Sequence, residues 1–180
     1  MRMNDYIETT LQSKNVYHGA IFDVESHDVR LPNGNISKRD IIKHHGAVCI
    51  LATKDNKVLL VRQYRKAIEQ SLFEVPAGKL DSPKEEPLSA AKRELEEETN
   101  YQARHWKEVY TFVVSPGYCT EKITLFEATE LIEVENPLSL DEDEFLDIVW
   151  IEIPKALEMV EDGTIIDAKT IIALQYLALQ

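Results

Sequence analysis

The sequence has few cysteines, and none of them is spaced for metal binding. Its two cysteines, Cys49 and Cys119, lie far apart, and no Cys-x-x-Cys motif occurs. Cys49 stands in an apolar run and Cys119 in a separate stretch, which favours buried or inert thiols over a disulfide. The five histidines also lack metal-ligand spacing. These absences argue against a disulfide scaffold and against a zinc site.

Positive charge is also scarce. Lys and Arg together number 20 against 32 Asp and Glu, giving a formal net charge of −12. This balance argues against binding to DNA or to an anionic membrane, and a phosphate-bearing substrate would need metal ions to offset it. No apolar run approaches the roughly 20 residues that span a bilayer, and the first residues form no apolar signal core. We therefore expect a cytoplasmic protein that binds neither nucleic acid nor membrane.

The length of 180 residues fits one domain with a small appendage. Residues 15–30 show loose two-residue alternation, 32–35 supply a turn and 36–43 extend again, which predicts an antiparallel hairpin region. Its few large apolar side chains cannot support an independent domain, so it must pack on the rest of the chain or on a second subunit. We predict a dimerisation region over 1–43 and a main domain over 44–180.

The main domain reads as strands flanked by helices. Helices on both sides of the strands imply an α/β fold whose sheet is covered on both faces. The expected strands are 46–53, 58–64, 108–115, 123–131 and 146–151. Two helices are expected near the end of the chain, at 154–161 and 167–178.

Residues 75–101 join a Gly/Pro loop to a glutamate-rich helix. Pro87 suits the first helical position, and a stripe that can face a core recurs every three or four residues. The stripe consists of Leu88, Ala91, Leu95 and Thr99. The helix is thus expected to be anchored along one side.

Three carboxylates share a neighbouring face of this helix. Glu94, Glu97 and Glu98 fall at i, i+3 and i+4, where like charges repel unless a cation sits between them. Oxygen-only ligands suit a hard cation, Mg²⁺ or Mn²⁺. Arg93 can also pair with Glu97 one turn on. The alternative for such a helix is a plain solvated acidic face.

The context of these glutamates resembles the Nudix box, a glycine and a glutamate followed by Arg-Glu-aliphatic-x-Glu-Glu-x-Gly. The matching residues are Gly78, Glu85, Arg93, Glu94, Glu97 and Glu98. The sequence departs from the pattern twice. Six residues instead of five separate Gly78 from Glu85, which implies a one-residue insertion, and Asn100 replaces the closing glycine. Asparagine is the next most tolerant residue of the left-handed conformation at a helix end.

The resemblance implies an α/β/α sandwich with a mixed sheet and the hydrolysis of a nucleoside diphosphate linked to another moiety. It implies that Glu94, Glu97 and Glu98 hold the metal together with the backbone carbonyl of Ala77, and that Glu85 steadies the site. Clustered divalent ions lower the pKa of the attacking water and neutralise phosphate oxygens, which is what cleaving a pyrophosphate requires.

A narrower resemblance, to ADP-ribose pyrophosphatases, covers nearly the whole chain. It implies cleavage of ADP-ribose to AMP and ribose 5-phosphate by a homodimer whose N-terminal strands swap between subunits. The stretches that carry it are Arg30–Gly34, His45–Ala47, Gln63–Arg65, Glu74–Gly78, Ser115–Tyr118 and Ile171–Gln175.

The same resemblance suggests the remaining site residues. The general base falls in the acidic loop 141–144, where we favour Glu142 with support from Glu144, although such a loop can also be merely solvated. Substrate contacts are expected from Arg39, Arg65, Glu74 and Glu121, each of which has a surface ion pair as its alternative. Three other functions stay open: a pyrophosphatase preferring another nucleoside diphosphate sugar, a Nudix domain that binds a nucleotide without cleaving it, and a purely structural acidic protein.

Overall fold

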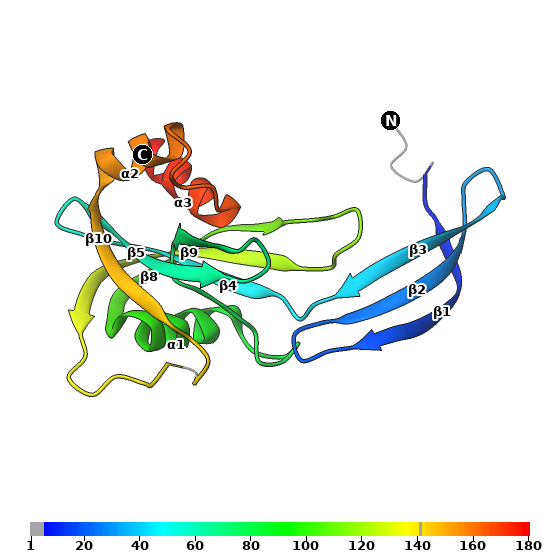
Figure 1. Ribbon diagram of the computed structural model, residues 1–180, viewed down its shortest axis with the longest axis horizontal. Coiled ribbons are helices and arrows are strands. Elements are labelled where there is room, and N and C mark those ends of the chain that lie inside the picture. The colour runs from blue at the N-terminus through cyan, green and yellow to red at the C-terminus, as the bar shows by residue number, and fades with distance from the viewer. Residues whose placement is uncertain (1–5, 141) are drawn as a thin grey trace. The chain divides into compact units, whose positions relative to one another are not determined.

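The structure is a computed structural model that describes residues 6–140 and 142–180. The chain divides into two compact units, which are described separately (Figure 1). The smaller unit contains the described residues up to Gly46 together with Val113–Lys122, and the larger contains Ala47–Phe112 and Ile123–Gln180. The predicted division at residues 43 and 44 did not anticipate that 113–122 would join the smaller unit.

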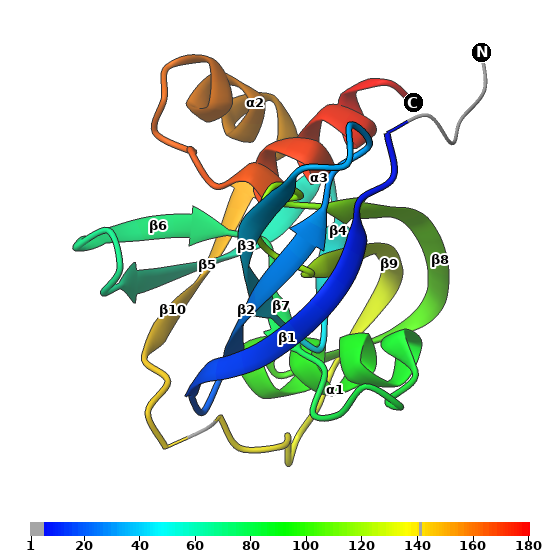
Figure 2. The same ribbon diagram turned by 90° about the vertical axis from the view of Figure 1, so that its right-hand side faces the viewer.

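The smaller unit is built on a three-stranded antiparallel sheet with β2 in the middle (Figure 2). The predicted turn is present: Gly34 has a φ of +87° and donates its N–H to Leu31 O. The alternating segment 15–30 is not one strand, because Gly19 donates to Phe22 O in a second turn. The strands are β1 (Thr9–His18), β2 (Asp23–Arg30) and β3 (Ile36–Lys43).

This sheet buries little of its apolar surface. Every residue of β1 is exposed, and Val29 is the one buried hydrophobic side chain among the unit's described residues. Exposed apolar side chains include Leu11, Val16 and Tyr17. The sheet therefore lacks the core that an independent domain needs.

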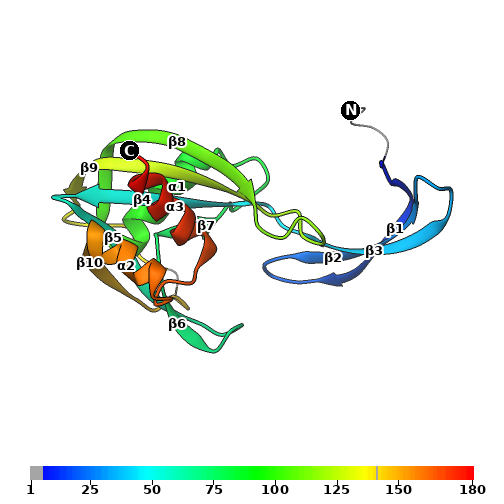
Figure 3. The ribbon, with the colours of Figure 1, turned by 90° about the horizontal axis from the view of Figure 1, so that it is seen from above.

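The larger unit contains a seven-stranded mixed sheet in the order β10-β5-β4-β9-β8, with β6 paired to β5 and β7 paired to β4 (Figure 3). Strand β4 runs parallel to β9 and antiparallel to β5 and β7. Sequence reasoning missed the short strands β6 and β7. The strands are β4 (Ala47–Lys54), β5 (Lys57–Arg65), β6 (Gln70–Glu74), β7 (Ala77–Lys79), β8 (Tyr101–Val113), β9 (Lys122–Glu133) and β10 (Leu146–Glu152).

Helices cover both faces of this sheet, which confirms the predicted α/β/α sandwich. Helix α1 (Pro87–Thr99) lies on one face, and α2 (Ile153–Glu161) and α3 (Ala168–Ala178) lie on the other (Figure 1). Alternate residues of a strand point to opposite faces. In β4, Val48 and Ile50 accordingly join the core under α1, while Cys49 and Leu51 join the core under α2 and α3.

The boundaries of α1 confirm the sequence prediction. Pro87 is its first residue, and Asn100 closes it in the left-handed conformation with a φ of 62°. The buried stripe differs in its first turn, because Leu88 is 38 % exposed while Ala90 is buried. The buried face also includes Glu94 and Glu98, so these carboxylates lie at the edge of the core rather than on a solvated face.

The two cysteines are free thiols, as expected. Burial raises the pKa of the Cys49 thiol to about 12, which keeps it protonated and unreactive. Among residues 6–140 and 142–180, no helix has the length and apolar character needed to cross a membrane.

Candidate active site

The acidic face of α1 places two buried carboxyl groups one turn apart. Glu94 is 7 % exposed and Glu98 is 3 % exposed. Burial raises the pKa of Glu94 to about 7, despite the nearby Arg93, and raises the pKa of Glu98 to about 8, despite a backbone N–H that donates to it. The charge of Glu144 raises both pKa values further. The nearby positive charge therefore does not fully offset the effect of burial on the pair.

Arg93 supplies part of that balance. Its Nη1 donates to Glu94 Oε1 at 2.8 Å and to Glu97 Oε2 at 2.9 Å, the second being the predicted i, i+4 pair. Burial acts to lower the pKa of the Arg93 guanidinium. The nearby Glu94 and Glu97 carboxylates act more strongly in the other direction, so the pKa is raised. Arg93 Nε is buried without a hydrogen-bond partner in the described part of the chain. Arg93 thus holds both glutamates through a single nitrogen, Nη1.

Gly78 leaves room for the Glu94 carboxylate. A Cβ at position 78 would lie 1.9 Å from Glu94 Cδ, inside the carboxylate group. Strand β7, which carries Gly78, pairs with β4 and so runs close to α1. A side chain at this position is incompatible with the observed place of Glu94, which is the physical reason for a glycine here.

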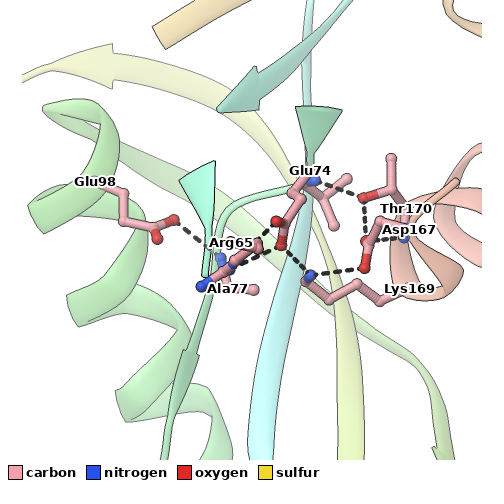
Figure 4. A network of polar contacts seen from close by, with 8 residues as sticks. Arg65, Glu74, Ala77, Glu98, Asp167, Lys169 and Thr170 are labelled. Carbon is pink, nitrogen blue, oxygen red and sulfur yellow. Dashed lines mark hydrogen bonds and ion pairs between the residues drawn. The ribbon is translucent and has the colours of Figure 1, made fainter. Parts of the chain in front are cut away.

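Strand β7 and the loop that follows it are held by side chains at both ends. On one side Ala77 donates its N–H to Glu98 Oε2 at 3.0 Å (Figure 4). On the other side Glu85 Oε2 accepts from Asp81 N at 2.6 Å, and Glu85 Oε1 lies 3.6 Å from Arg93 Nη2.

A buried ionic network surrounds Glu74, which is 2 % exposed. Arg65 donates to both its carboxylate oxygens, at 2.7 and 2.8 Å, and Lys169 donates to it as well (Figure 4). Burial acts to raise the pKa of Glu74, but Arg65 and Lys169 outweigh it and hold that pKa below its usual range. Glu74 is therefore ionised and fully paired.

The donor set fits a hard divalent cation. Glu94, Glu97 and Glu98 offer only oxygen ligands, and two of them have pKa values raised by burial and mutual repulsion, which a bound cation relieves. Among the residues that the structure describes, no three Asp, Glu, His or Cys side chains are already gathered to hold an ion. Arg93 draws Glu94 and Glu97 to itself, and Ala77 holds Glu98. Arg93 contacts one oxygen of Glu94 and one oxygen of Glu97, so the other oxygen of each can meet an ion while the pairing with Arg93 is kept.

Comparison with known proteins decides the family. The family described as NUDIX domain matches residues 43–174, and the nucleoside diphosphate sugar hydrolase N-terminal domain matches residues 8–42. The chain belongs to the Nudix family. The resemblance seen in the sequence is confirmed, and the protein is a Nudix hydrolase, a class of enzymes that depends on a metal ion.

Several relatives match almost the full chain. A methanol dehydrogenase activator of Bacillus methanolicus is 44 % identical over 174 residues, covering 96 % of this chain and 94 % of the relative. An ADP-ribose pyrophosphatase of Bacillus subtilis (strain 168) is 43 % identical over 179 residues, covering 99 % and 96 %. The crystal structure of an ADP compounds hydrolase superimposes with a TM-score of 0.83 at 26 % identity, covering 95 % and 92 %.

The two glutamates suggested as the base differ in their surroundings. Glu144 is half-buried, and its charge acts on both Glu94 and Glu98. Glu142 is exposed. Asp141, in the same loop, lies outside the described residues. The charge of Glu144 therefore acts on the buried Nudix carboxylates.

Two of the predicted substrate residues lie in the smaller unit. Arg39 donates from Nη2 to Glu8 at 2.5 Å and from Nη1 to Ser37 Oγ at 3.1 Å. Glu121 lies 3.7 Å from His44 Nδ1. The other two, Arg65 and Glu74, lie in the larger unit and pair with each other.

Two hollows share part of their lining, and one of them opens beside the Nudix helix. One, of about 530 Å³, is lined by Glu97, Glu98 and Asn100 together with residues 137–140 and 146–148. The second, of about 540 Å³, shares Leu140, Leu146 and Asp147 with it and extends along β5 and β6; its other lining residues are Arg62, Tyr64, Ser71, Glu144 and Phe145. The first hollow leaves space for a ligand beside the acidic face of α1.

Sequence reasoning missed the contribution of α3 to this region. Asp167 caps that helix by accepting from Thr170 N at 3.0 Å. Lys169 and Thr170 gave no signal in the sequence, because their partners Glu74 and Val75 lie 95 residues away.

Proposed function

We propose that the protein hydrolyses the pyrophosphate bond of ADP-ribose, giving AMP and ribose 5-phosphate, with Mg²⁺ as the metal and Mn²⁺ as a substitute. The observation that carries the proposal is the buried pair of Glu94 and Glu98 beside Ala77 and Gly78 of strand β7. The relative named ADP-ribose pyrophosphatase, 43 % identical over nearly the full length, supports the choice of substrate.

In this proposal Glu94, Glu97, Glu98 and the backbone carbonyl of Ala77 hold the metal. When bound, the metal lowers the pKa of the attacking water and neutralises phosphate oxygens. Arg93 orients Glu94 and Glu97 through its paired hydrogen bonds. The other box residues act on the backbone, Gly78 by making room for Glu94 and Glu85 by bracing the loop.

The general base comes from the acidic loop, as Glu142 or Glu144. The electrostatic connection to Glu94 and Glu98 favours Glu144. A base must come within hydrogen-bond reach of the water that it deprotonates, and Glu144 lines the hollow that adjoins the one beside Glu98. Loss of activity in Glu144→Gln but not in Glu142→Gln would support this choice, and the reverse would return the role to Glu142.

Substrate binding is assigned to Arg65, Glu74, Arg39 and Glu121. Arg65 is 42 % exposed while its partner Glu74 is buried, so its guanidinium can keep the ion pair and still meet a phosphate. Arg39 and Glu121 are assigned to the substrate as the sequence resemblance implies. A drop in affinity for ADP-ribose without loss of metal binding in Arg39→Ala and Glu121→Gln is the expected result.

A homodimer completes the proposal. The β1–β3 sheet exposes apolar side chains and buries almost none, and a second copy would cover them. Size-exclusion chromatography with light scattering should give twice the 20.6 kDa mass of the chain, and Tyr17→Glu should shift it toward the monomer. A monomer of full activity would exclude a dimeric site.

The deciding experiment compares ADP-ribose with a panel of nucleotide sugars and nucleoside triphosphates, with Mg²⁺ and with chelator. Metal-dependent release of AMP that prefers ADP-ribose and collapses in Glu98→Gln is expected. Preference for another nucleotide sugar would keep the Nudix hydrolase and discard ADP-ribose. Binding of a nucleotide without cleavage would favour a sensor.

A second candidate function rests on the relative named methanol dehydrogenase activator, which is 44 % identical. The chain would then raise the activity of a methanol dehydrogenase. Adding wild-type protein or Glu98→Gln to such a dehydrogenase separates the possibilities. Activation by wild type alone would mean that hydrolysis produces the effect, activation by both would mean a binding role, and activation by neither would reject this candidate.

A further inference from the structure

Val75, Pro76 and Ala77, which lead from β6 into β7, each make a hydrogen bond to another part of the larger unit. Val75 N–H donates to Thr170 Oγ1 at 2.8 Å, Pro76 O accepts from Ile50 N at 2.8 Å, and Ala77 N–H donates to Glu98 Oε2 at 3.0 Å. Pro76 also has a φ locked by its ring. A shift of Val75 is therefore expected to move Ala77 as well, because Pro76 between them has little conformational freedom.

The direction of the Thr170 bond follows from its other partner. The Thr170 hydroxyl lies 2.6 Å from Asp167 Oδ2, and an ionised carboxylate can only accept. The single hydroxyl proton therefore goes to Asp167, which leaves the oxygen free to accept from Val75 N–H. Thr170 and Val75 are both fully buried, so water cannot replace the bond.

Lys169 holds the preceding residue of the same segment. Its Nζ donates to Glu74 and, at 3.1 Å, to Asp167 Oδ1. Glu74 is also held by Arg65, so two cations and two carboxylates balance one another. Figure 4 shows the result, with Ala77 between Glu98 on α1 and the Glu74 network that reaches α3.

We propose that Thr170 and Lys169 are positioning residues for the metal site. They fix residues 74–77 from the α3 side, and the Ala77 N–H then sets the orientation of the Glu98 carboxylate, although neither Thr170 nor Lys169 touches metal or substrate. The inference rests on the proposed function only in taking Ala77 and Glu98 as metal ligands. Residues that orient metal ligands from behind typically change metal affinity by about 10- to 100-fold when removed.

The test is Thr170→Val, which keeps the shape of the side chain and removes the hydroxyl. Thr170→Ser keeps the hydroxyl and serves as the rescue variant. Thr124→Val is the matched control, because Thr124 is also a buried threonine of the larger unit, and its hydroxyl pairs with Thr111 at 3.2 Å instead of with the loop. Mn²⁺ binding is measured directly from the electron paramagnetic resonance signal of free Mn²⁺, and ADP-ribose hydrolysis is measured against Mg²⁺ concentration.

We expect Thr170→Val to weaken Mn²⁺ binding by about 10-fold or more and to raise the half-saturating Mg²⁺ concentration to match. Thr170→Ser should restore both, and Thr124→Val should leave both unchanged even if it lowers the unfolding temperature. Equal Mn²⁺ affinity in Thr170→Val and wild type overturns the inference. Failure of wild type itself to bind Mn²⁺ or cleave the substrate would instead defeat the proposed function.

Lys169→Met provides an independent variant if Thr170→Val does not fold. It keeps the buried stem of the side chain and removes one of the two cations that hold Glu74. We expect a weakening of Mn²⁺ binding by a few fold, less than in Thr170→Val because Arg65 remains. Lys155→Met, which removes an exposed ion pair with Glu158, is its control. Identical Mn²⁺ binding in Lys169→Met, Lys155→Met and wild type would show that Lys169 has no positioning role.

Discussion

Replacing Gly78 with alanine tests whether the loop and the helix fit together as the structure shows. The added Cβ would lie 1.9 Å from Glu94 Cδ and 2.0 and 2.3 Å from its carboxylate oxygens. Non-bonded carbon atoms settle at about 3.5 Å, so the carboxylate must retreat by roughly 1.5 Å. The clashing atoms end a flexible side chain, and the backbone at Gly78 is not left-handed. The fold should therefore survive.

The expected cost falls on the reaction. A misplacement of about 1 Å can lower a rate by about 100-fold, so we expect Gly78→Ala to lose at least that factor in kcat. The assay is AMP release from ADP-ribose at saturating Mg²⁺. Thermal unfolding of the same samples should show a shift of only a few degrees.

Two controls make the prediction specific. Gly117→Ala adds a Cβ that meets nothing within 4 Å and should leave the rate unchanged. In a Glu94→Ala background the clash disappears, so adding Gly78→Ala should cost little more, as expected when two changes act through one contact. If Gly78→Ala lowers the rate by the same factor in both backgrounds, displacement of Glu94 is not the cause.

Four further results are expected. Because the folded-state pKa of Glu74 is lowered below 4.5, its stabilising effect is present above that pH and lost below it; the gap in unfolding free energy between wild type and Glu74→Gln should narrow from about pH 6 to about pH 3. Asn100→Val should destabilise by about 1–2 kcal/mol in urea unfolding, because Asn100 is left-handed, and Asn100→Gly should not. In native protein at pH 8, thiol reagents should label Cys119 well before Cys49, and equal rates would contradict the burial of Cys49. Chelation of metal should abolish hydrolysis, and Glu98→Gln should raise the metal concentration needed to restore it.

Local signals made most of the fold predictable. Pro87 and Asn100 mark the two ends of α1 by their backbone preferences, and both lie where expected. The continuous apolar run in β4 identified a strand buried on both faces. Strands β6 and β7 escaped prediction because they are five and three residues long, too short to show alternation.

The site was predictable only where it is local in sequence. The spacing of Glu94, Glu97 and Glu98 on one helix fixes their common face, and the structure keeps them there. The burial of Glu94 and Glu98 was not visible, because it comes from β4 and β7 packing on α1. Leu88 was expected in the core from its spacing, but it is 38 % exposed. Periodicity shows which face of a helix is apolar, and it does not show how much of the first turn the core covers.

Long-range partners were out of reach. Arg65 and Glu74 read as substrate contacts, and their mutual pairing across neighbouring strands depends on the register of β5 with β6. The attachment of Lys169 and Thr170 depends on where α3 docks, which no spacing in the sequence encodes.

The bond between Val75 and Thr170 also sets an order of events during synthesis of the chain. Ribosomes add about 5–20 residues per second, so the loop waits on the order of 5–20 s before its partner on α3 exists. A nascent chain that has reached only residue 160 already carries Ala77, Glu94, Glu97 and Glu98 but nothing to hold residues 74–77 from the α3 side. The bond that holds residues 74–77 from the α3 side can therefore form only late in translation, after the strands of the supporting sheet have been made.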